Sequence, residues 1–261
     1  MQQLCYSGDM NKAILTVTDL TKLYDDKPVV DGISFTVKQG EVFGILGPNG
    51  AGKTTTLEMI ETMRPIDGGS VLVDGIDVAK NPDAIKRIIG VQPQSAAFQE
   101  KTKLTEIIEM FSAAYGERVE PIKFLEDVDL AEKANSYAEQ LSGGQRQRLS
   151  IAAALVHNPK VFFMDEPTTG LDPQARRNLW DLTRAIQKRG VTVLLTTHYL
   201  DEAEILCDRV AIMDRGKIIA LDTPKNLISQ LLKRGFKKDT TVQQANLEDV
   251  FIDLTGKGLR D

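Results

Sequence analysis

Residues 42–55 read VFGILGPNGAGKTT, an apolar run followed by a glycine-rich stretch and then Lys-Thr-Thr. A short apolar run closed by Gly-Pro-Asn-Gly is typical of a buried strand that ends in a tight turn. The residues beyond the last glycine predict the start of a helix. The order strand, glycine turn, helix therefore indicates a fold in which strands and helices alternate.

The segment 47–54 fits the pattern G-x-x-x-x-G-K-[ST], whose glycines let successive backbone N–H groups converge on phosphate oxygens at a helix amino terminus. Lys53 is expected to reach the β- and γ-phosphates, and the Thr54 hydroxyl to bind Mg²⁺. The alternative is an ordinary glycine turn with a solvated lysine, which the preceding strand disfavours. The residues predicted to bind nucleotide here are Gly47, Pro48, Asn49, Gly50, Ala51, Gly52, Lys53, Thr54 and Thr55.

Apolar runs and helical spacing alternate along the rest of the chain. This alternation predicts an α/β fold with a mostly parallel sheet covered on both faces, interrupted by a helical insertion. Strands are expected at 13–17, 33–37, 71–73, 161–164 and 191–196, with a terminal hairpin at 209–213 and 217–221. Helices are expected at 82–87, 105–115, 146–156 and 173–189, the last beginning after Asp172 and ending at Gly190.

Two carboxylates, Asp165 and Glu166, directly follow the apolar run 161–164. Ligands of open α/β sheets bind at this edge, beyond the carboxyl ends of the strands. Asp165 is expected to hold Mg²⁺ through water, and Glu166 to orient and deprotonate an attacking water molecule. An isolated Asp-Glu pair would better fit a solvated loop, but the phosphate loop upstream reverses that preference.

The composition is that of a globular protein: 261 residues, 42% apolar, 26% charged and a net charge of −5. A mildly acidic chain has no overall field that would draw it to nucleic acid or to an anionic bilayer. No apolar run reaches the roughly 18 residues that span a membrane, and 1–11 show no secretory signal. Cys5 and Cys207 lie far apart, which suits a reducing cytosol and makes a structural disulfide improbable.

Three further segments are LSGGQRQR at 141–148, DEPTTGLDP at 165–173 and Thr-His at 197–198. With the phosphate loop, they closely resemble the ATP-binding cassette family over roughly 13–222. The resemblance implies a P-loop NTPase with a mostly parallel core sheet, an antiparallel β subdomain and a helical insertion. The cassette would occupy 12–222, with a helical subdomain at about 95–140, and 223–261 would form a short carboxyl-terminal helical extension.

The resemblance also implies an ATPase that uses ATP and Mg²⁺ and works as a pair. Two cassettes, as a homodimer or a related heterodimer, would sandwich each ATP between the phosphate loop of one and the LSGGQ signature of the other. A hydroxyl and free N–H groups at a helix start suit a γ-phosphate. The signature residues expected to contact ATP are Ser142, Gly143, Gly144 and Gln145.

Several other residues match single positions in the pattern of the ATP-binding cassette family. Tyr24 matches the aromatic residue that stacks on adenine, although it could be an ordinary loop tyrosine. Gln94 matches the glutamine that senses Mg²⁺ and the attacking water, with Gln92 as a rival, and His198 matches the γ-phosphate histidine. Asp172 matches the aspartate that crosses the dimer interface, and could instead, or as well, cap a helix. The expected catalytic set is Glu166, His198 and Gln94, and the expected metal set is Thr54, Gln94 and Asp165. His157 is unmatched and is expected on the surface.

One phosphate loop and one signature, roughly 90 residues apart, fit a transporter cassette, and the tail 247–256 looks like that of bacterial drug, antibiotic and ion efflux cassettes. That tail could equally be an amphipathic helix that packs locally. The predicted protein is the ATP-hydrolysing subunit of an exporter, peripheral to the cytoplasmic face of the cell membrane. Separate transmembrane permease chains would dock on the helical insertion through a short helix.

The exposed or buried state of four apolar residues bears on this docking, since each could face either the permease or the core: Phe98, Ile107, Phe111 and Tyr115. No nucleic-acid partner is expected. The alternative functions are an ATP-gated switch acting on a nucleic-acid or ribosomal partner, and a nucleotide-binding regulator without turnover.

Overall fold

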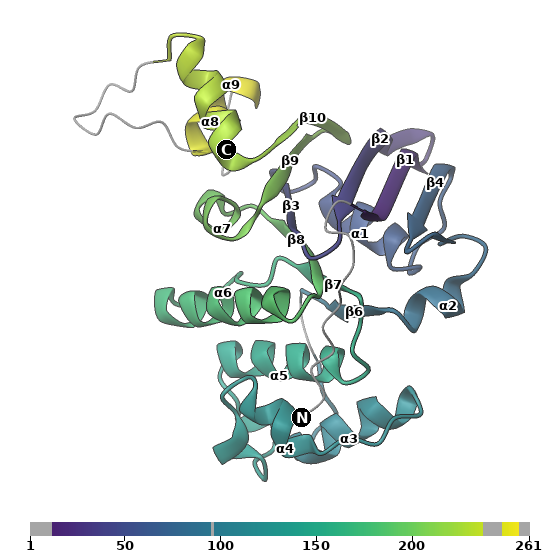
Figure 1. Ribbon diagram of the computed structural model, residues 1–261, viewed down its shortest axis with the longest axis vertical. Helices are drawn as coiled ribbons and strands as arrows, with labels where there is room; N and C mark the ends of the chain where they lie inside the picture. Colours follow the sequence, from purple (N-terminus) through teal and green to yellow (C-terminus); the bar gives the residue numbers. More distant parts are fainter. Residues whose placement is uncertain (1–11, 95–96, 237–246, 256–261) are drawn as a thin grey trace.

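The computed structural model describes residues 12–94, 97–236 and 247–255 (Figure 1). Among these residues, the strands form a six-stranded core sheet and a separate four-stranded sheet. The core sheet has the order β10-β9-β3-β8-β7-β6, and every neighbouring pair is parallel except β10 and β9. Its strands are β3 (Val42–Leu46), β6 (Ile89–Gln92), β7 (Val161–Asp165), β8 (Thr192–Thr197), β9 (Arg209–Asp214) and β10 (Lys217–Asp222).

The four-stranded sheet is antiparallel, with the order β2-β1-β4-β5. Its strands are β1 (Ala13–Tyr24), β2 (Lys27–Lys38), β4 (Gly68–Val73) and β5 (Ile76–Asp77). The predicted mostly parallel core sheet and antiparallel β subdomain are therefore both confirmed.

Alternation along the buried strands divides the apolar side chains between two layers. Phe163 packs with α1 (Lys53–Ile60) and the antiparallel sheet, whereas Phe162 and Met164 pack against helices on the opposite face. The helices on that opposite face are α5 (Gly143–Leu155), α6 (Pro173–Lys188) and α7 (Leu200–Leu206). Because both faces are covered, these strands read as continuous apolar runs in the sequence.

The helical insertion has a core of its own, built on the lower side of α5 in Figure 1. Ile107 is fully buried there, while Phe98, Phe111 and Tyr115 are half-buried against it. Its elements are α3 (Leu104–Ala114), α4 (Pro121–Glu126) and two short 3₁₀ turns, η1 (Ala131–Lys133) and η2 (Ala138–Gln140). The helix predicted at 105–115 is confirmed within one residue.

Beyond the core sheet, α8 (Pro224–Lys233) and α9 (Leu247–Thr255) pack against each other (Figure 1). Val250 is buried on the α7 side of the fold, and Arg234 pairs with Asp253 at 2.5 Å. The predicted helical tail is thus observed over 224–233 and 247–255. Residues 1–11, including Cys5, lie outside the described residues, as do Ser95 and the end of the tail at residue 256.

Several local predictions differ from the structure. The short strand β6 and the seven-residue helix α7 are absent from the sequence prediction, because neither is long enough to show a period. β1 extends to Tyr24 rather than ending near 17, since register shifts and the positive φ of Asp19 hide its alternation. The surface prediction for His157 is wrong: its ring stacks on Tyr115 with centroids 3.7 Å apart, and Nε2 lies 2.8 Å from the carbonyl oxygen of Ile89.

One further element connects the sheets. The helix α2 (Pro82–Lys86), predicted from its early proline, begins after Asn81 and leads directly into β6.

Candidate active site

The phosphate loop is wedged between strands of the core sheet. Gly47 N donates to the carbonyl of Thr197 at 3.3 Å, and a Cβ on Gly47 would lie 2.2 Å from the carbonyl oxygen of Met213. Gly52 caps α1 with φ of 102°, a left-handed conformation that favours glycine. The glycines at these two positions therefore let the loop fit against the ends of β8 and β9 and turn into α1.

Lys53 is 4% exposed, and its ammonium group contacts two carbonyl oxygens and one carboxylate of the same chain. It donates to the carbonyls of Gly47 at 2.9 Å and Pro48 at 3.1 Å, and lies 3.2 Å from Glu166 Oε1. Burial lowers the pKa of Lys53, and the charge of Glu166 opposes that shift. The lysine therefore holds a buried cation at the loop, directly against a carboxylate.

Asp165 ends β7 and is held by hydroxyls on both sides. It accepts from Thr54 Oγ1 at 3.1 Å and from Thr196 Oγ1. Burial raises the pKa of Asp165, and both hydroxyls favour the charged form and oppose that shift. The described residues contain no cluster of three or more His, Cys, Asp or Glu side chains suited to a metal. One carboxylate and one hydroxyl nevertheless fit Mg²⁺, which binds few protein oxygens and completes its shell with water and phosphate.

Glu166 is 8% exposed and lies where three predicted residues meet. Its Oε2 is 3.2 Å from His198 Nδ1, and the same oxygen accepts from Gln94 Nε2 at 3.4 Å. Burial acts to raise the pKa of Glu166, but the charges of Lys53 and His198 outweigh it, so the pKa lies below its usual value. The predicted catalytic set of Glu166, His198 and Gln94 is thus brought together, with a charged carboxylate at its centre.

The backbone at Glu166 adopts φ of 46°, which is uncommon for a residue other than glycine. Its N–H donates to the carbonyl of Thr196 at 3.1 Å and to the Thr196 hydroxyl at 3.0 Å. These bonds to the neighbouring strand hold the strained conformation, which turns the side chain towards Lys53 and His198.

The two rival glutamines have different environments. Gln92 is fully buried at the end of β6 and donates to the carbonyl of Pro93 at 2.8 Å. Gln94 lies outside the sheet and reaches Glu166. The geometry therefore favours Gln94 over Gln92 as the glutamine of this site.

Other predicted site residues lie apart from this centre. Tyr24 is 40% exposed at the end of β1, and its hydroxyl accepts from Arg64 Nη1 at 2.6 Å. Ser142 caps α5 by accepting from Gln145 N at 3.3 Å, and Gln145 Oε1 accepts from Ser142 N and Lys133 Nζ. Within the described residues, no hydrogen bond or ion pair links 142–145 to the phosphate loop.

Asp172 is the helix cap that its position allowed, since its carboxylate accepts from Gln174 N and Ala175 N at 2.9 Å each. The sequence prediction missed Thr196, which bonds to Asp165, and Thr169, whose hydroxyl donates to Glu166 at 3.4 Å. Thr196 pairs with Asp165 in the register of two parallel strands. The polar residues at the end of the apolar run 191–196 were the feature of the sequence from which Thr196 could have been predicted.

A glycine loop at the carboxyl edge of a parallel sheet, with a buried Lys–Glu–His cluster beside it, defines a P-loop nucleoside triphosphatase. A model of the ABC transporter family matches residues 30–169, and the chain belongs to that family. It is therefore an ATP-binding, ATP-hydrolysing subunit of a membrane transporter, which works with a permease and as a dimer. Within the part of the chain that is described, no helix is both long and apolar enough to cross a bilayer.

Several curated relatives align over most of the chain. The linearmycin resistance ATP-binding protein LnrL of Bacillus subtilis is 40% identical over 223 residues, covering 84% of this chain and 72% of the relative. The Nod factor export ATP-binding protein I of Burkholderia thailandensis is 43% identical over 224 residues, covering 84% and 74%. The daunorubicin/doxorubicin resistance ATP-binding protein DrrA of Streptomyces peucetius is 42% identical over 222 residues, covering 83% and 67%.

Solved structures agree on the fold. An ATP-binding subunit of an ABC transporter superimposes with a TM-score of 0.80 at 29% identity, over 93% of this chain and 99% of that one. The ADP conformation of MJ1267, an ATP-binding cassette of an ABC transporter, gives a TM-score of 0.77 at 27% identity, over 85% and 95%. These matches do not favour the alternative of a switch acting on nucleic acid or the ribosome.

Proposed function

We propose that this chain is the motor of an exporter and that Glu166 is its catalytic base. The observation that carries the proposal is the position of the Glu166 carboxylate, between the buried ammonium of Lys53 and His198. The direction of transport rests on the relatives, which are named for export or for resistance to linearmycin and daunorubicin/doxorubicin.

In the proposed reaction, Glu166 Oε2 accepts a proton from water as the water oxygen attacks the γ-phosphorus. The bond from the γ-phosphorus to the bridging oxygen breaks, and ADP carries away the electron pair. Lys53 stabilises charge on the β- and γ-phosphates, and Gln94 and His198 orient the water and the γ-phosphate. Thr54 and Asp165, with Gln94 nearby, would hold Mg²⁺, whose charge neutralises the phosphate oxygens.

The signature supports a pairing of two cassettes. Ser142 and Gly143 are exposed at the start of α5, and a Cβ on Gly143 would meet nothing within 4 Å in this chain. A helix start with free N–H groups suits an anion. Within the described residues, no hydrogen bond joins this helix start to the phosphate loop of the same chain. We infer that Ser142, Gly143, Gly144 and Gln145 complete the ATP site of a second cassette.

The adenine end of ATP is assigned to Tyr24. Tyr24 is 40% exposed, and the guanidinium of Arg64 lies 5.8 Å from the centroid of its ring. Bonding of the hydroxyl to Arg64 fixes the ring, and an oriented aromatic face is what a base needs for stacking.

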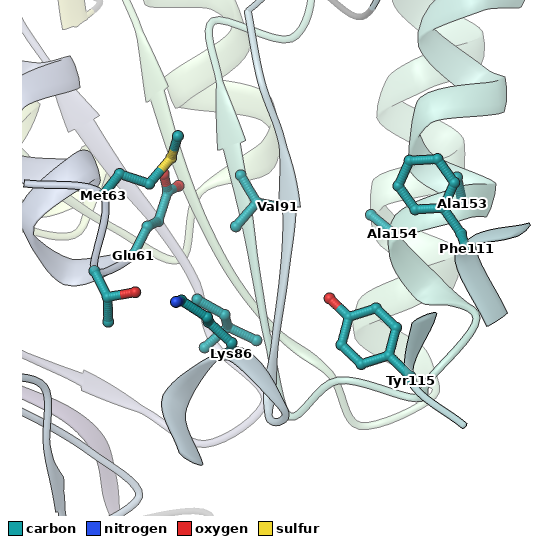
Figure 2. Close-up of a pocket in the computed structure, with 10 residues that line it drawn as sticks. Glu61, Met63, Lys86, Val91, Phe111, Tyr115, Ala153 and Ala154 are labelled. Atoms are coloured by element: carbon teal, nitrogen blue, oxygen red, sulfur yellow. The ribbon is translucent and has the colours of Figure 1, made fainter. Parts of the chain in front are cut away.

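A cleft of about 500 Å³ separates the core from the helical insertion (Figure 2). Phe111 and Tyr115 stand on one wall, and Glu61, Met63 and Lys86 lie on the other. We assign this cleft to a short helix from the permease, which places the subunit on the cytoplasmic face of the membrane. The half-buried state of Phe111 and Tyr115 fits residues that serve the insertion core and the cleft together.

The test compares the unmodified protein with Glu166→Gln, and measures mass by light scattering with ATP and Mg²⁺ beside hydrolysis. The amide keeps the shape but cannot accept the proton, so turnover should fall at least about a hundredfold while ATP still drives dimerisation. The matched control is Glu166→Gln with Gly143→Ala. The added methyl fits the monomer, so this variant should fold normally and yet fail to dimerise. Rapid hydrolysis by Glu166→Gln would overturn the role of Glu166.

A further inference from the structure

Glu61 caps the carboxyl end of α1 and lines the cleft beside the helical insertion (Figure 2). The residue is 6% exposed, and its Oε1 atom is fully buried without a hydrogen-bond partner. A carboxyl group that is buried and unpartnered is costly to the fold, and each such group calls for an explanation.

Two cations that could reach Glu61 are paired with other carboxylates. Arg64 pairs with Glu58, and Lys86, which lines the same cleft, pairs with Asp83 at 3.5 Å. Burial, together with the negative charges of Asp165 and Glu58, raises the pKa of Glu61 to about 8. Among the described residues, no cation lowers the pKa of Glu61, so its negative charge would have no partner there.

Most of the remaining lining is apolar, although Thr62 and Lys86 also line the cleft. Ile89, Val91, Phe111, Ala153 and Ala154 line it together with the ring of Tyr115. Figure 2 places the aromatic residues across the cleft from Glu61. A matching occupant therefore has an apolar face towards Phe111 and Tyr115 and one hydrogen-bond-donating cation on the side facing Glu61.

We propose that Glu61 binds a lysine or arginine side chain carried by the permease segment that docks in this cleft, and thereby selects the partner by charge. The inference rests on the proposed docking function and adds the chemistry of recognition. A guanidinium or ammonium supplies a hydrogen-bond donor to the Glu61 carboxyl group, and a cation in a largely apolar cleft is held by a strong, charge-assisted bond. The same site rejects a segment that carries an acidic residue at that position.

The experiment selects binders from a displayed library of 14-residue helices, with leucine and alanine fixed on one face and the remaining positions randomised. The baits are the full chain and its Glu61→Gln, Glu61→Lys and Phe111→Asp variants. The unmodified chain should enrich lysine or arginine at one position. Those helices should bind Glu61→Gln at least about tenfold more weakly, because an amide leaves the cation unpaired. Glu61→Lys should enrich aspartate or glutamate at the same position.

Phe111→Asp separates the two hypotheses. Helices that lose binding to Phe111→Asp but bind Glu61→Gln as well as the unmodified chain occupy the cleft without using Glu61, which overturns the inference and leaves the docking proposal intact. Helices insensitive to both substitutions bind elsewhere and overturn both. Glu61→Gln is nearly isosteric, so the result does not depend on whether Glu61→Lys folds.

A second experiment measures the proton that Glu61 should release when a basic helix binds. With a pKa of about 8, the Glu61 carboxyl carries a proton at pH 7 in the free chain, and pairing with a cation should expel it. Calorimetry at pH 7 in two buffers of different ionisation enthalpy should report release of close to one proton per bound basic helix, and none with Glu61→Gln. Equal proton release from both proteins would overturn the inference.

Discussion

Glu166 and Glu61 are buried to nearly the same extent, with 8% and 6% of their surfaces exposed, yet their pKa values move in opposite directions. Lys53 and His198 hold the pKa of Glu166 below its usual value, whereas Glu61 has acidic neighbours and a pKa raised to about 8. Burial acts in the same sense on both. The presence or absence of a partner cation decides the outcome.

This difference separates two kinds of site. The chain balances the charges of its own active site, so that the carboxylate at the catalytic centre is ionised before substrate arrives. At the cleft the described part of the chain gives Glu61 Oε1 no hydrogen-bond partner, and ionising this carboxyl group at neutral pH becomes favourable only when another molecule brings a cation. Catalysis needs the first arrangement, and selective docking is served by the second.

Replacing Lys53 with alanine should have the largest effect, because it would make Glu166 resemble Glu61. ATP hydrolysis should fall at least about a hundredfold, as a donor to the phosphates is lost. Burial then dominates, so the pKa of Glu166 should rise above its usual value. Steady-state turnover measures the first effect, and a carboxyl carbon NMR titration of Glu166 measures the second.

Lys217→Ala is the matched control, since Lys217 pairs with Asp31 in an exposed bridge and should alter turnover little. If the Glu166 pKa stayed low in Lys53→Ala, the comparison with Glu61 would lose its physical basis.

The phosphate-loop region was predictable because its chemistry is local in the sequence. The motif 47–54 and the pair Asp165-Glu166 each follow an apolar strand, and parallel strands bring their carboxyl ends to one edge. The cluster of Lys53, Glu166 and His198 followed from that rule together with the family resemblance. Thr196 escaped prediction, because its contact with Asp165 depends on the register of β7 and β8.

Glu61 could not be found in this way. In the sequence it is one of several polar residues at the end of a helical segment, and nothing local marks it as buried. It lines a cleft whose other walls come from β6, α3 and α5, which are distant in sequence. The surface prediction for His157 failed for the same reason, because Tyr115 and Ile89 cover that ring from two other elements.

Glu61→Gln should change how stability depends on pH. The folded-state pKa is raised, so the native chain holds an extra proton between about pH 4.5 and 8, and stability falls as pH rises through that window. The glutamine variant lacks this term. From pH 5.5 to 7.5, the unmodified chain should lose roughly 2.7 kcal/mol more unfolding free energy than Glu61→Gln, about 1.4 kcal/mol per pH unit. Urea denaturation at the two pH values measures the difference.

Glu58→Gln is the control for this result, because Glu58 lies on α1 three residues before Glu61 and is paired with Arg64. It should move the decline of stability only slightly towards lower pH, because Glu58 is the smallest of the three causes that raise the pKa of Glu61. Parallel pH curves for the unmodified chain and Glu61→Gln would mean that Glu61 already has a partner cation.

Lys86→Gln should have the smallest effect and gives the closest test of whether Glu61 is unpartnered. Lys86 lines the same cleft but pairs with exposed Asp83, so its loss should change the unfolding free energy by no more than about 0.5 kcal/mol. The decline of stability with pH should keep its position, since no cation is removed from Glu61. If Lys86 did pair with Glu61 in solution, its removal would raise the Glu61 pKa further. The decline would then extend above pH 8, and urea denaturation between pH 7.5 and 9 would detect it.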